Sequence, residues 1–243
     1  MKYRNYVMTG VVAVSLLMFT TSCGDDNDSL QDIINGGGSK EPDKIEAVDL
    51  GLSVKWATCN IGASSPEKFG GYYAWGETEE KETYWWDNYK YWTDNNGDGT
   101  AYTYDEDGYR EIDESELTDI GIYISGTEYD VARQKWGDNW RMPTQRESNE
   151  LLHKCTWKKE TYNGVTGWRV TGPNGNSIFL PAAGYRSVKG YYAGERGYYW
   201  TAENHYYYRA YTYMIVCSEY SHDATLYSPR NYGHPIRAVM DIE

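Results

Sequence analysis

An oxygen-rich run near the middle of the chain has residue types and a spacing suited to a hard cation. Counted as a calcium loop, its ligands are Asp94, Asn96, Asp98, Thr100 through its carbonyl, and Asp105. Calcium takes roughly six to eight oxygen ligands, and a glycine after the third of these residues would provide the sharp turn. The flanking sequence has no helical pattern, and Asp-Asn-Gly runs also form ordinary turns. Calcium binding and a plain turn are therefore both open.

A second group of chemically capable side chains lies toward the C-terminus. The chain has 26 tyrosines and 10 tryptophans but only 3 phenylalanines, so most of its aromatic side chains carry a polar atom. Tyrosine offers a large rigid contact surface with a hydroxyl group, and aromatic faces stack on sugar rings. We predict a surface that binds a glycan or a protein, formed by Tyr191, Tyr192, Arg196, Glu203, Asn204, His205, Tyr206, Tyr207, Tyr208, Tyr220, Arg230 and Tyr232.

Other aromatic residues of the same region fall in expected strands. We assign Tyr199, Trp200, Tyr211 and Tyr213 to the packing of the sheet, because strand residues of this size are usually at least half buried.

Catalytic motifs are weak in this sequence. The four histidines match neither HExxH nor another metal-ligand spacing, and no GxSxG occurs. Carboxylates are plentiful, so a pair for glycoside hydrolysis remains open, but no pair stands out. We expect a protein that is not an enzyme, with polysaccharide hydrolysis as the less favoured alternative.

Two helices are expected in the middle of the chain. Thr144 with Glu147 three residues later forms a capping box, which predicts a helix over 145–154. A shorter helix is expected over 128–136, with Thr127 as its N-cap.

Strand patterns surround these helices. Expected strands include a pair around Gly51 and Leu52, a hairpin turning at Asn163-Gly164, and segments at 177–181, 197–201, 209–217, 224–227 and 235–240. Residues 77–127 are expected to form a long insertion with little regular structure. Helices early and strands late predict an α+β domain with an antiparallel sheet and an all-β C-terminal half.

The N-terminal residues indicate where in the cell the protein is located. Lys2 and Arg4 precede an apolar segment, and small residues then lead to Cys23. This order resembles a bacterial lipoprotein signal peptide over 1–22, which implies cleavage before Cys23 and acylation of that cysteine. An ordinary signal peptide with a chance cysteine is the alternative. Residues 23–44 have the composition of an acidic, glycine-rich tether, and a single domain is expected over 45–243.

The acidic start of this tether is similar to the export signal of some surface lipoproteins. We therefore expect a lipid anchor in the outer membrane and a domain that faces the cell exterior. A net charge of −13 argues against a nucleic-acid partner, which requires clustered Lys and Arg. The cell exterior permits disulfides. We predict a bond between Cys59 and Cys155 with Cys217 unpaired, although spacing alone does not select the pair.

Several phrases of the domain resemble one family. They lie at 48–62, 73–78, 140–147, 172–186, 199–201 and 232–239. Together they resemble the FISUMP, or major paralogous, domain of bacterial surface lipoproteins over about 46–240. The resemblance implies a C-type-lectin-like fold, with two helices packed on a twisted antiparallel sheet. This fold also includes formylglycine-generating enzymes and retroelement variable proteins, and the latter build their ligand surface from the C-terminal part.

The departures from these relatives limit what the resemblance implies. The chain lacks the paired C-terminal cysteines of formylglycine-generating enzymes and the Glu-Pro-Asn phrase of calcium-dependent lectins, so neither activity is carried over. We expect Trp136, Trp140 and Leu151 in the core, and structural roles for Arg141 and Glu147. Arg237 is expected in the structural C-terminal strand, where it would pair with a carboxylate.

The function that we expect is that of a cell-surface lipoprotein that binds a glycan or protein ligand through its tyrosine-rich C-terminal face. A structural or tip component of a surface assembly is the alternative.

Overall fold

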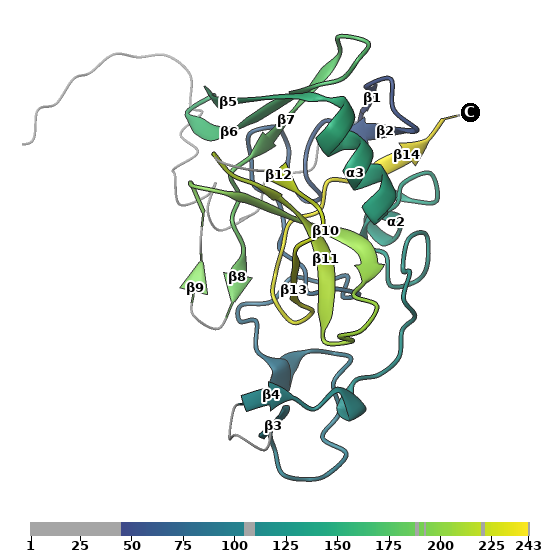
Figure 1. The fold of residues 1–243 in the computed structure, drawn as a ribbon, viewed down its shortest axis with the longest axis vertical. Helices are drawn as coiled ribbons and strands as arrows, with labels where there is room; N and C mark the ends of the chain where they lie inside the picture. Colours follow the sequence, from purple (N-terminus) through teal and green to yellow (C-terminus); the bar gives the residue numbers. More distant parts are fainter. Residues whose placement is uncertain (1–44, 105–109, 188–189, 192, 220–221, 243) are drawn as a thin grey trace, which may run out of the picture.

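The computed structural model describes residues 45–104, 110–187, 190–191, 193–219 and 222–242 (Figure 1). Cys23 and the rest of 1–44 lie outside this range, so the lipoprotein segment stays a prediction. Within the described residues, no helix has the length and apolar character needed to cross a membrane.

The fold is mixed α+β and consists mostly of strands, as predicted. Its elements are β1 (Ala47–Asp49), β2 (Val54–Ala57), η1 (Trp86–Asn88), β3 (Tyr102–Tyr104), β4 (Arg110–Ile112), η2 (Glu114–Glu116), α2 (Val131–Trp136), α3 (Gln145–Lys154), β5 (Thr156–Tyr162), β6 (Val165–Thr171), β7 (Ser177–Pro181), β8 (Arg186–Ser187), β9 (Gly190–Tyr191), β10 (Gly197–Asn204), β11 (Tyr211–Cys217), β12 (His222–Asp223), β13 (Tyr227–Pro229) and β14 (Val239–Asp241). All pairs between these strands are antiparallel. After α3 the described elements are all strands, as expected.

Helix α3 begins and ends where the sequence predicted. The Thr144 hydroxyl accepts from the Glu147 amide at 3.2 Å, and the Glu147 carboxylate accepts from the Thr144 amide at 2.8 Å, which completes the capping box. The Glu147 carboxylate also accepts two bonds from the Arg141 guanidinium, at 2.6 and 2.9 Å. Arg141 binds Asp241 of β14 as well, so Arg141 and Glu147 join α3 to the last strand in the structural role that we expected.

Helix α2 is shorter than predicted, and its cap is a different residue. Asp130, not Thr127, is the N-cap: its carboxylate accepts from the Ala132 and Arg133 amides. The amides of Gly126 and Met142 also donate to this fully buried carboxylate. Burial raises the pKa of Asp130, and the four amide donors act in the opposite direction.

A three-stranded sheet, in the order β1-β2-β14, joins the two ends of the described chain. Behind it lies Arg237, which is 1% exposed and donates to Asn60 Oδ1 and to the carbonyls of Ala57, Thr58 and Phe179. The expected carboxylate partner was therefore wrong, because backbone carbonyls and an amide satisfy the guanidinium. We call this sheet, with Asn60 and Arg237, the frame.

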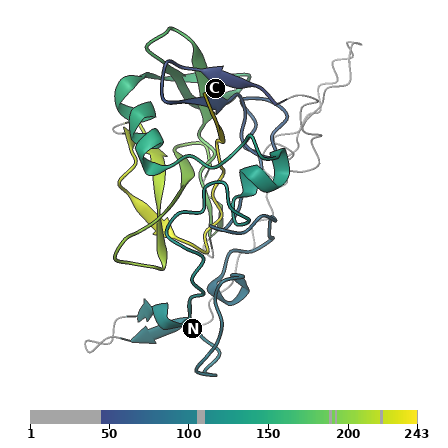
Figure 2. The same ribbon diagram turned by 90° about the vertical axis from the view of Figure 1, so that its right-hand side faces the viewer.

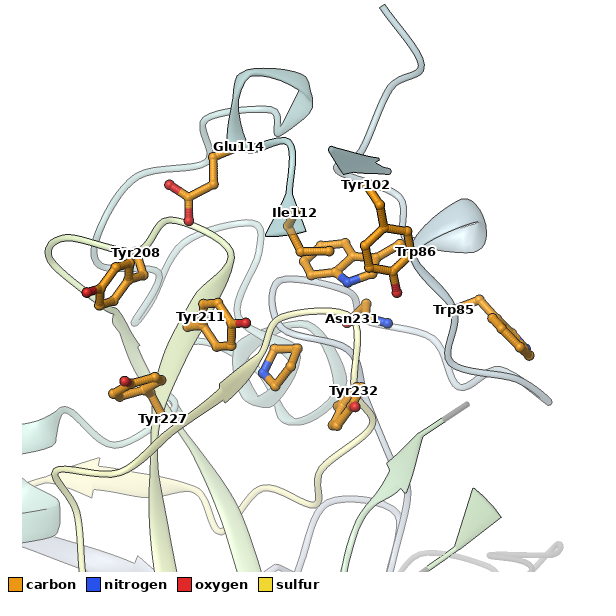
Figure 3. Close-up of a pocket in the computed structure, with 11 residues that line it drawn as sticks. Trp85, Trp86, Tyr102, Ile112, Glu114, Tyr208, Tyr211, Tyr227, Asn231 and Tyr232 are labelled. Atoms are coloured by element: carbon orange, nitrogen blue, oxygen red, sulfur yellow. The ribbon is translucent and has the colours of Figure 1, made fainter. Parts of the chain in front are cut away.

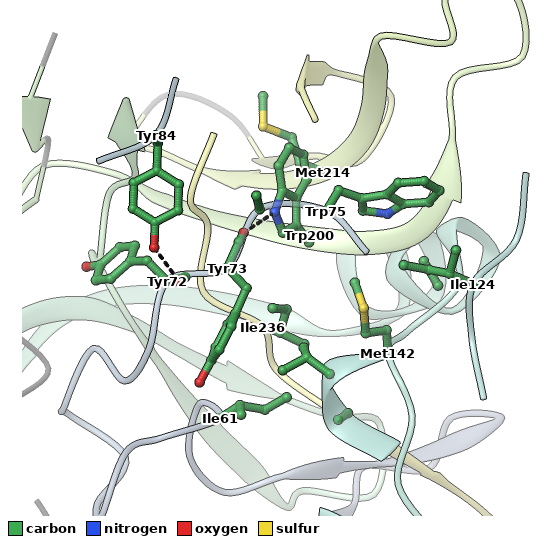
Figure 4. Close-up of a cluster of buried hydrophobic side chains, with 14 of the residues drawn as sticks. Ile61, Tyr72, Tyr73, Trp75, Tyr84, Ile124, Met142, Trp200, Met214 and Ile236 are labelled. Atoms are coloured by element: carbon green, nitrogen blue, oxygen red, sulfur yellow. Dashed lines mark hydrogen bonds between the residues drawn. The ribbon is translucent and has the colours of Figure 1, made fainter. Parts of the chain in front are cut away.

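Strands β10 and β11 separate two clusters of buried side chains. The expected core residues divide between them: Trp140 belongs to the first with Trp136 packed against it, and Leu151 belongs to the second. Along β11, Met214 faces the first cluster and Ile215 the second, so alternate residues serve opposite faces. Figure 4 shows the first cluster, whose indoles and phenols mostly hydrogen-bond to backbone carbonyls of neighbouring segments.

The hairpin of β5 and β6 turns at Asn163-Gly164, as predicted. Asn163 has φ 46° and Gly164 has φ 81°, the positive values that a tight hairpin turn requires. Two details of the C-terminal half differ from expectation. The strand predicted at 224–227 is replaced by β12 and β13. The last strand is confined to β14, because residues 235–238 belong to no strand.

The long insertion forms a distinct end of the molecule. It contains η1, the small hairpin of β3 and β4, and η2, and it lies at the end of the long axis opposite the frame (Figures 1 and 2). Trp86, Tyr89, Leu117 and Ile124 bury their side chains in the first cluster. These apolar contacts fix the insertion to the domain although it has little regular structure.

The predicted disulfide between Cys59 and Cys155 is not formed. Cys155 follows α3 and packs against the second cluster, whereas Cys59 lies in the loop after β2, beside Arg237. Cys217 is buried in the second cluster and is also unoxidised. Burial raises the pKa of the Cys155 thiol to about 11, which keeps that thiol protonated near neutral pH.

Candidate functional site

An aromatic cavity lies between the insertion and the C-terminal sheet (Figure 3). Its volume is about 650 Å³, within the usual range for a site that holds a small ligand. We call it the aromatic pocket. Its lining residues are Trp85, Trp86, Tyr102, Ile112, Glu114, Tyr208, Tyr211, Tyr227, Pro229, Asn231 and Tyr232.

One wall of the aromatic pocket comes from the turn at η1. The Asn88 side chain accepts from the Trp85 amide and donates to both oxygens of Thr83, which fixes the turn. Trp86 points into the core and packs edge-to-face on Tyr89, with ring centroids 5.5 Å apart. Trp85 is 47% exposed, so it offers an indole surface to solvent at the rim.

The opposite wall comes from β11 and β13. Their antiparallel register places Tyr211 opposite Pro229, and Tyr211 meets Tyr227 with ring centroids 5.5 Å apart. Behind them the His205 ring packs on Tyr208 and Tyr227, at 4.9 and 4.6 Å between centroids. His205 Nδ1 also accepts from the Tyr207 and Tyr208 amides, so the imidazole fixes the loop that carries Tyr208. Burial lowers the pKa of His205, while the nearby Glu114 carboxylate raises it.

Polar contacts clamp the two walls together. Glu114 Oε1 accepts from the Ala210 amide at 2.9 Å, across 96 residues of sequence. In return, the Arg209 guanidinium donates to the carbonyls of Leu117 and Glu114. The insertion is therefore held to the loop between β10 and β11 at the mouth of the aromatic pocket.

Two adjacent buried residues, Arg230 and the lining residue Asn231, have polar atoms whose hydrogen bonding is incomplete. Asn231 is 2% exposed; its Nδ2 donates to the Tyr84 carbonyl, but its Oδ1 has no partner within the described residues. The adjacent Arg230 is 1% exposed and lies over the Trp75 ring, and its Nε donates to the Tyr89 hydroxyl. Its Nη2 likewise finds no partner there. Buried polar atoms are normally satisfied, so these two unpaired atoms are exceptions near the aromatic pocket.

No family model, curated protein or solved structure was found to match this chain. Its site is therefore defined by its own geometry.

The structure divides the predicted binding tyrosines. Tyr208 and Tyr232 line the aromatic pocket. Tyr206 and Tyr207 are 70% and 77% exposed on the same loop but do not line it. The backbone of Tyr191 lies in β9, whereas its side chain, Tyr192 and Tyr220 fall outside the described part of the chain.

Other predicted ligand residues serve the fold or lie elsewhere. Glu203 accepts from the Gln145 amide at the start of α3, and Asn204 is buried and donates to the Arg209 carbonyl. Arg230 was expected on the surface, but its burial under the aromatic pocket contradicts this. Arg196 is exposed beside a different cavity, of about 620 Å³, that includes Lys159.

Most residues that line the aromatic pocket were not predicted from the sequence as ligand-binding residues. Tyr211 was assigned to sheet packing, yet it lines the aromatic pocket, while Tyr199 and Trp200 are buried as expected. The missed insertion residues carried a signal: adjacent tryptophans in a polar segment need a surface on which to pack. The sequence did not show which surface this was.

The candidate calcium loop is held by its own side chains. Asp94 accepts from the Gly97 and Gly99 amides, and Asp98 accepts from the Thr100 amide. The Asn96 side chain accepts from the Asp98 amide in the same way. Among the described residues, no group of three or more His, Cys, Asp or Glu is arranged to hold a metal, and Asp105 lies outside them. The described loop thus has the hydrogen bonds of a turn, and calcium binding stays a prediction.

The lining of the aromatic pocket suits recognition of a ligand. Within its described lining, Glu114 is the one ionisable carboxylate, whereas glycoside hydrolysis commonly uses two. Aromatic faces and one carboxylate together suit the binding of a small ring-shaped or chain-like ligand.

Proposed function

We propose that this chain is a cell-surface lipoprotein whose domain, of C-type-lectin-like fold, binds a ligand in the aromatic pocket. The lipoprotein part rests on the sequence around Cys23, and the fold assignment rests on the FISUMP resemblance together with the α+β architecture. The observation that carries the binding function is the aromatic pocket itself, which two segments far apart in the chain build together.

Several features of the aromatic pocket support this function. Trp85, Tyr208 and Tyr227 are each about half exposed at its rim, although burial of such rings elsewhere would stabilise the fold. The hydrogen bonds of Asn88, Glu114 and His205 hold the walls in place, so a ligand would meet a preformed site. Exposed aromatic surface on a rigid support is typical of binding sites.

The test compares aromatic residues inside and outside the aromatic pocket. The full-length chain is screened on an array of glycans and cell-surface proteins, with and without a calcium chelator. Trp85→Ala and Tyr208→Ala are each expected to weaken capture by about 1 to 3 kcal/mol, the cost of losing a central aromatic contact.

The matched controls are Tyr123→Ala in the insertion and Tyr207→Ala in the loop, both highly exposed and outside the lining. These controls should bind as the unmodified chain does. Equal losses in pocket and control variants would disprove the site. Loss of capture with chelator alone would instead implicate the loop at Asp94.

A further inference from the structure

We propose that His205 makes the aromatic pocket sensitive to acid: its neutral imidazole holds Tyr208 in the wall, and protonation of the imidazole releases the loop over 206–208. This inference rests on the proposed binding function and adds the regulation of the same site. Three observations support it: the hydrogen bonds at Nδ1 of the imidazole, the aromatic rings around it, and the way in which the loop is closed.

The imidazole of His205 holds the loop through one nitrogen atom. Nδ1 accepts from the Tyr207 amide at 3.2 Å and from the Tyr208 amide at 3.1 Å. An imidazole nitrogen accepts a hydrogen bond only while it carries no proton, so the neutral ring has its proton on Nε2. Protonation of Nδ1 would place an N–H donor against two other donors, and both hydrogen bonds would be lost. The hold on the loop therefore depends on the charge of the ring.

Tyrosine rings surround the imidazole and connect it to the aromatic pocket. The centroid of the His205 ring lies 4.9 Å from that of Tyr208, with 24° between the planes, and 4.6 Å from that of Tyr227. Both tyrosines line the aromatic pocket. The rings of Tyr213 and Tyr207 lie 5.1 and 6.4 Å from the imidazole. A change in the position of the loop therefore changes the lining itself.

The charges near the imidazole come from the insertion and from the chain on either side of it. Burial lowers the pKa of His205 more than the Glu114 carboxylate raises it. Glu203 accepts from a backbone amide at the start of α3, and Arg209 donates to carbonyls of the insertion. The phenol faces attract a cation, but the proton has to enter at Nδ1, where two amides already donate. The ring is therefore neutral near neutral pH and takes up its proton in acid.

The ends of the loop are joined without the imidazole, so its release stays local. The His205 amide donates to the Tyr211 carbonyl at 2.8 Å, and the Tyr211 amide donates to the Tyr208 carbonyl at 3.0 Å. The Ala210 amide is held by Glu114 at 2.9 Å. Because none of these bonds uses the ring, protonation frees the two amides bound to Nδ1 while β10 and β11 stay paired.

Nuclear magnetic resonance of the full-length, isotope-labelled chain tests the release without any ligand. The pH is lowered from about 8 to about 4 while the signals of His205 Nδ1 and of the Tyr207 and Tyr208 amides are followed. All three should change with one midpoint, below about pH 6.5, and the contact between the rings of Tyr208 and Tyr227 should weaken with them. The Arg237 amide in the frame should not change at this midpoint. If it does, the chain is unfolding and local release is wrong.

Two variants separate the acceptor from the ring. His205→Asn retains an acceptor oxygen close to the place of Nδ1 but does not titrate in this range, so its loop should keep the neutral-pH signals in acid. His205→Phe retains a packed ring without an acceptor, so its loop should show the acid-form signals at every pH. His153→Gln, at an exposed histidine of α3, is the control and should keep the transition of the unmodified chain.

Glu114→Gln determines which titrating group is responsible. The glutamine carbonyl can still accept from the Ala210 amide, but the charge that raises the pKa of His205 is removed. The transition should therefore remain and its midpoint should move to lower pH. Loss of the transition in this variant would assign the acid response to Glu114 and overturn the proposal.

Capture on the array of glycans and cell-surface proteins connects the loop to binding. The probe is the array component that the unmodified chain captures most strongly at about pH 7.5. Below the midpoint, its capture should weaken by at least about tenfold in the unmodified chain and by less than about threefold in His205→Asn.

The outcomes separate this inference from the function beneath it. Nδ1 without a proton at the acid end of the titration, amides that do not respond to its protonation, or a transition that persists in His205→Asn would each overturn the acid response. An equal loss of capture in the unmodified chain and in His205→Asn would overturn it as well. Capture of no array component at neutral pH would instead reject the binding function, and the resonance signals would still decide whether acid releases the loop.

Discussion

Arg237 and Arg230 are both about 1% exposed, yet their surroundings differ. Arg237 in the frame donates to Asn60 and to three backbone carbonyls, so its guanidinium engages all three nitrogens. Arg230 beneath the aromatic pocket uses two nitrogens and leaves Nη2 without a partner among the described residues. The hydrogen bonds of Arg237 in the frame are complete, whereas those of Arg230 are not.

This difference suggests that the two regions have different roles, one in folding and one in binding. A completed buried network holds the chain in one arrangement, and removing any member leaves others unsatisfied. Unsatisfied buried atoms cost stability, and those near the aromatic pocket add nothing that holds the fold. We therefore expect changes in the frame to act on folding and changes in the aromatic pocket to act on binding.

Arg237→Ala tests the frame and should have the largest effect. It leaves the Asn60 amide oxygen and the carbonyls of Ala57, Thr58 and Phe179 buried without their donor. We expect a loss of about 3 to 5 kcal/mol in the free energy of unfolding, measured by urea denaturation. Arg146→Ala, at an exposed arginine of α3, is the control and should change stability by less than about 0.5 kcal/mol. A similar small change for Arg237→Ala would end the distinction between the two regions.

His234 tests the boundary between the regions and should have the next largest effect. It is buried against Trp200, with Nε2 2.9 Å from the Ser228 hydroxyl, and burial lowers its pKa to about 3. Because the folded-state pKa of His234 is below the unfolded value, the contribution of neutral His234 to the free energy of unfolding is fully present above about pH 6.5. This contribution is lost as pH falls toward 3, because the unfolded chain then binds a proton at His234 that the folded chain does not bind.

The expected loss between these pH values is roughly 2 to 4 kcal/mol, read as a fall in the urea midpoint. His234→Gln cannot ionise and can still bond Ser228, so its stability should depend less on acid. His153→Gln, at an exposed histidine, should retain the full dependence. An unchanged pH profile in His234→Gln would show that other groups cause the acid sensitivity.

Reducing agent provides the test with the smallest expected effect. Since Cys59, Cys155 and Cys217 form no disulfide, adding dithiothreitol should leave the thermal unfolding midpoint unchanged. A disulfide would contribute about 2 to 4 kcal/mol, so a clear fall in the midpoint would reveal one. The hydrogen bonds and packing of the frame would then not be sufficient to explain the stability of the domain.

Local features of this fold were predictable, because the residues that decide them are neighbours in sequence. Thr144 and Glu147 cap α3 as predicted, and Asn163-Gly164 turns the β5–β6 hairpin. The start of α2 was missed even though Thr127 and Asp130 are both good caps. Amides of Gly126 and Met142 converge on Asp130, and that tertiary arrangement decides between them.

Long-range features were not predictable from one sequence. Glu114 and Ala210 meet across 96 residues, and without that contact nothing in the local pattern links Trp85 to Tyr227. Arg237 was expected to find a carboxylate, since charge pairing is the usual solution for a buried arginine. The carbonyls that accept from it instead lie at the end of β2, just after it, and in β7, and residue types alone do not bring these segments together.

The arrangement of the described chain ends gives the molecule a direction. Strands β1 and β14 both pair with β2, so the chain enters and leaves the domain side by side, at the far end of the long axis from the insertion (Figures 1 and 2). An attachment at either end would therefore place the insertion at the end of the domain far from the point of attachment. For binding measurements, the chain could be coupled to a sensor chip through the residues after Asp241. The insertion would then face the sample.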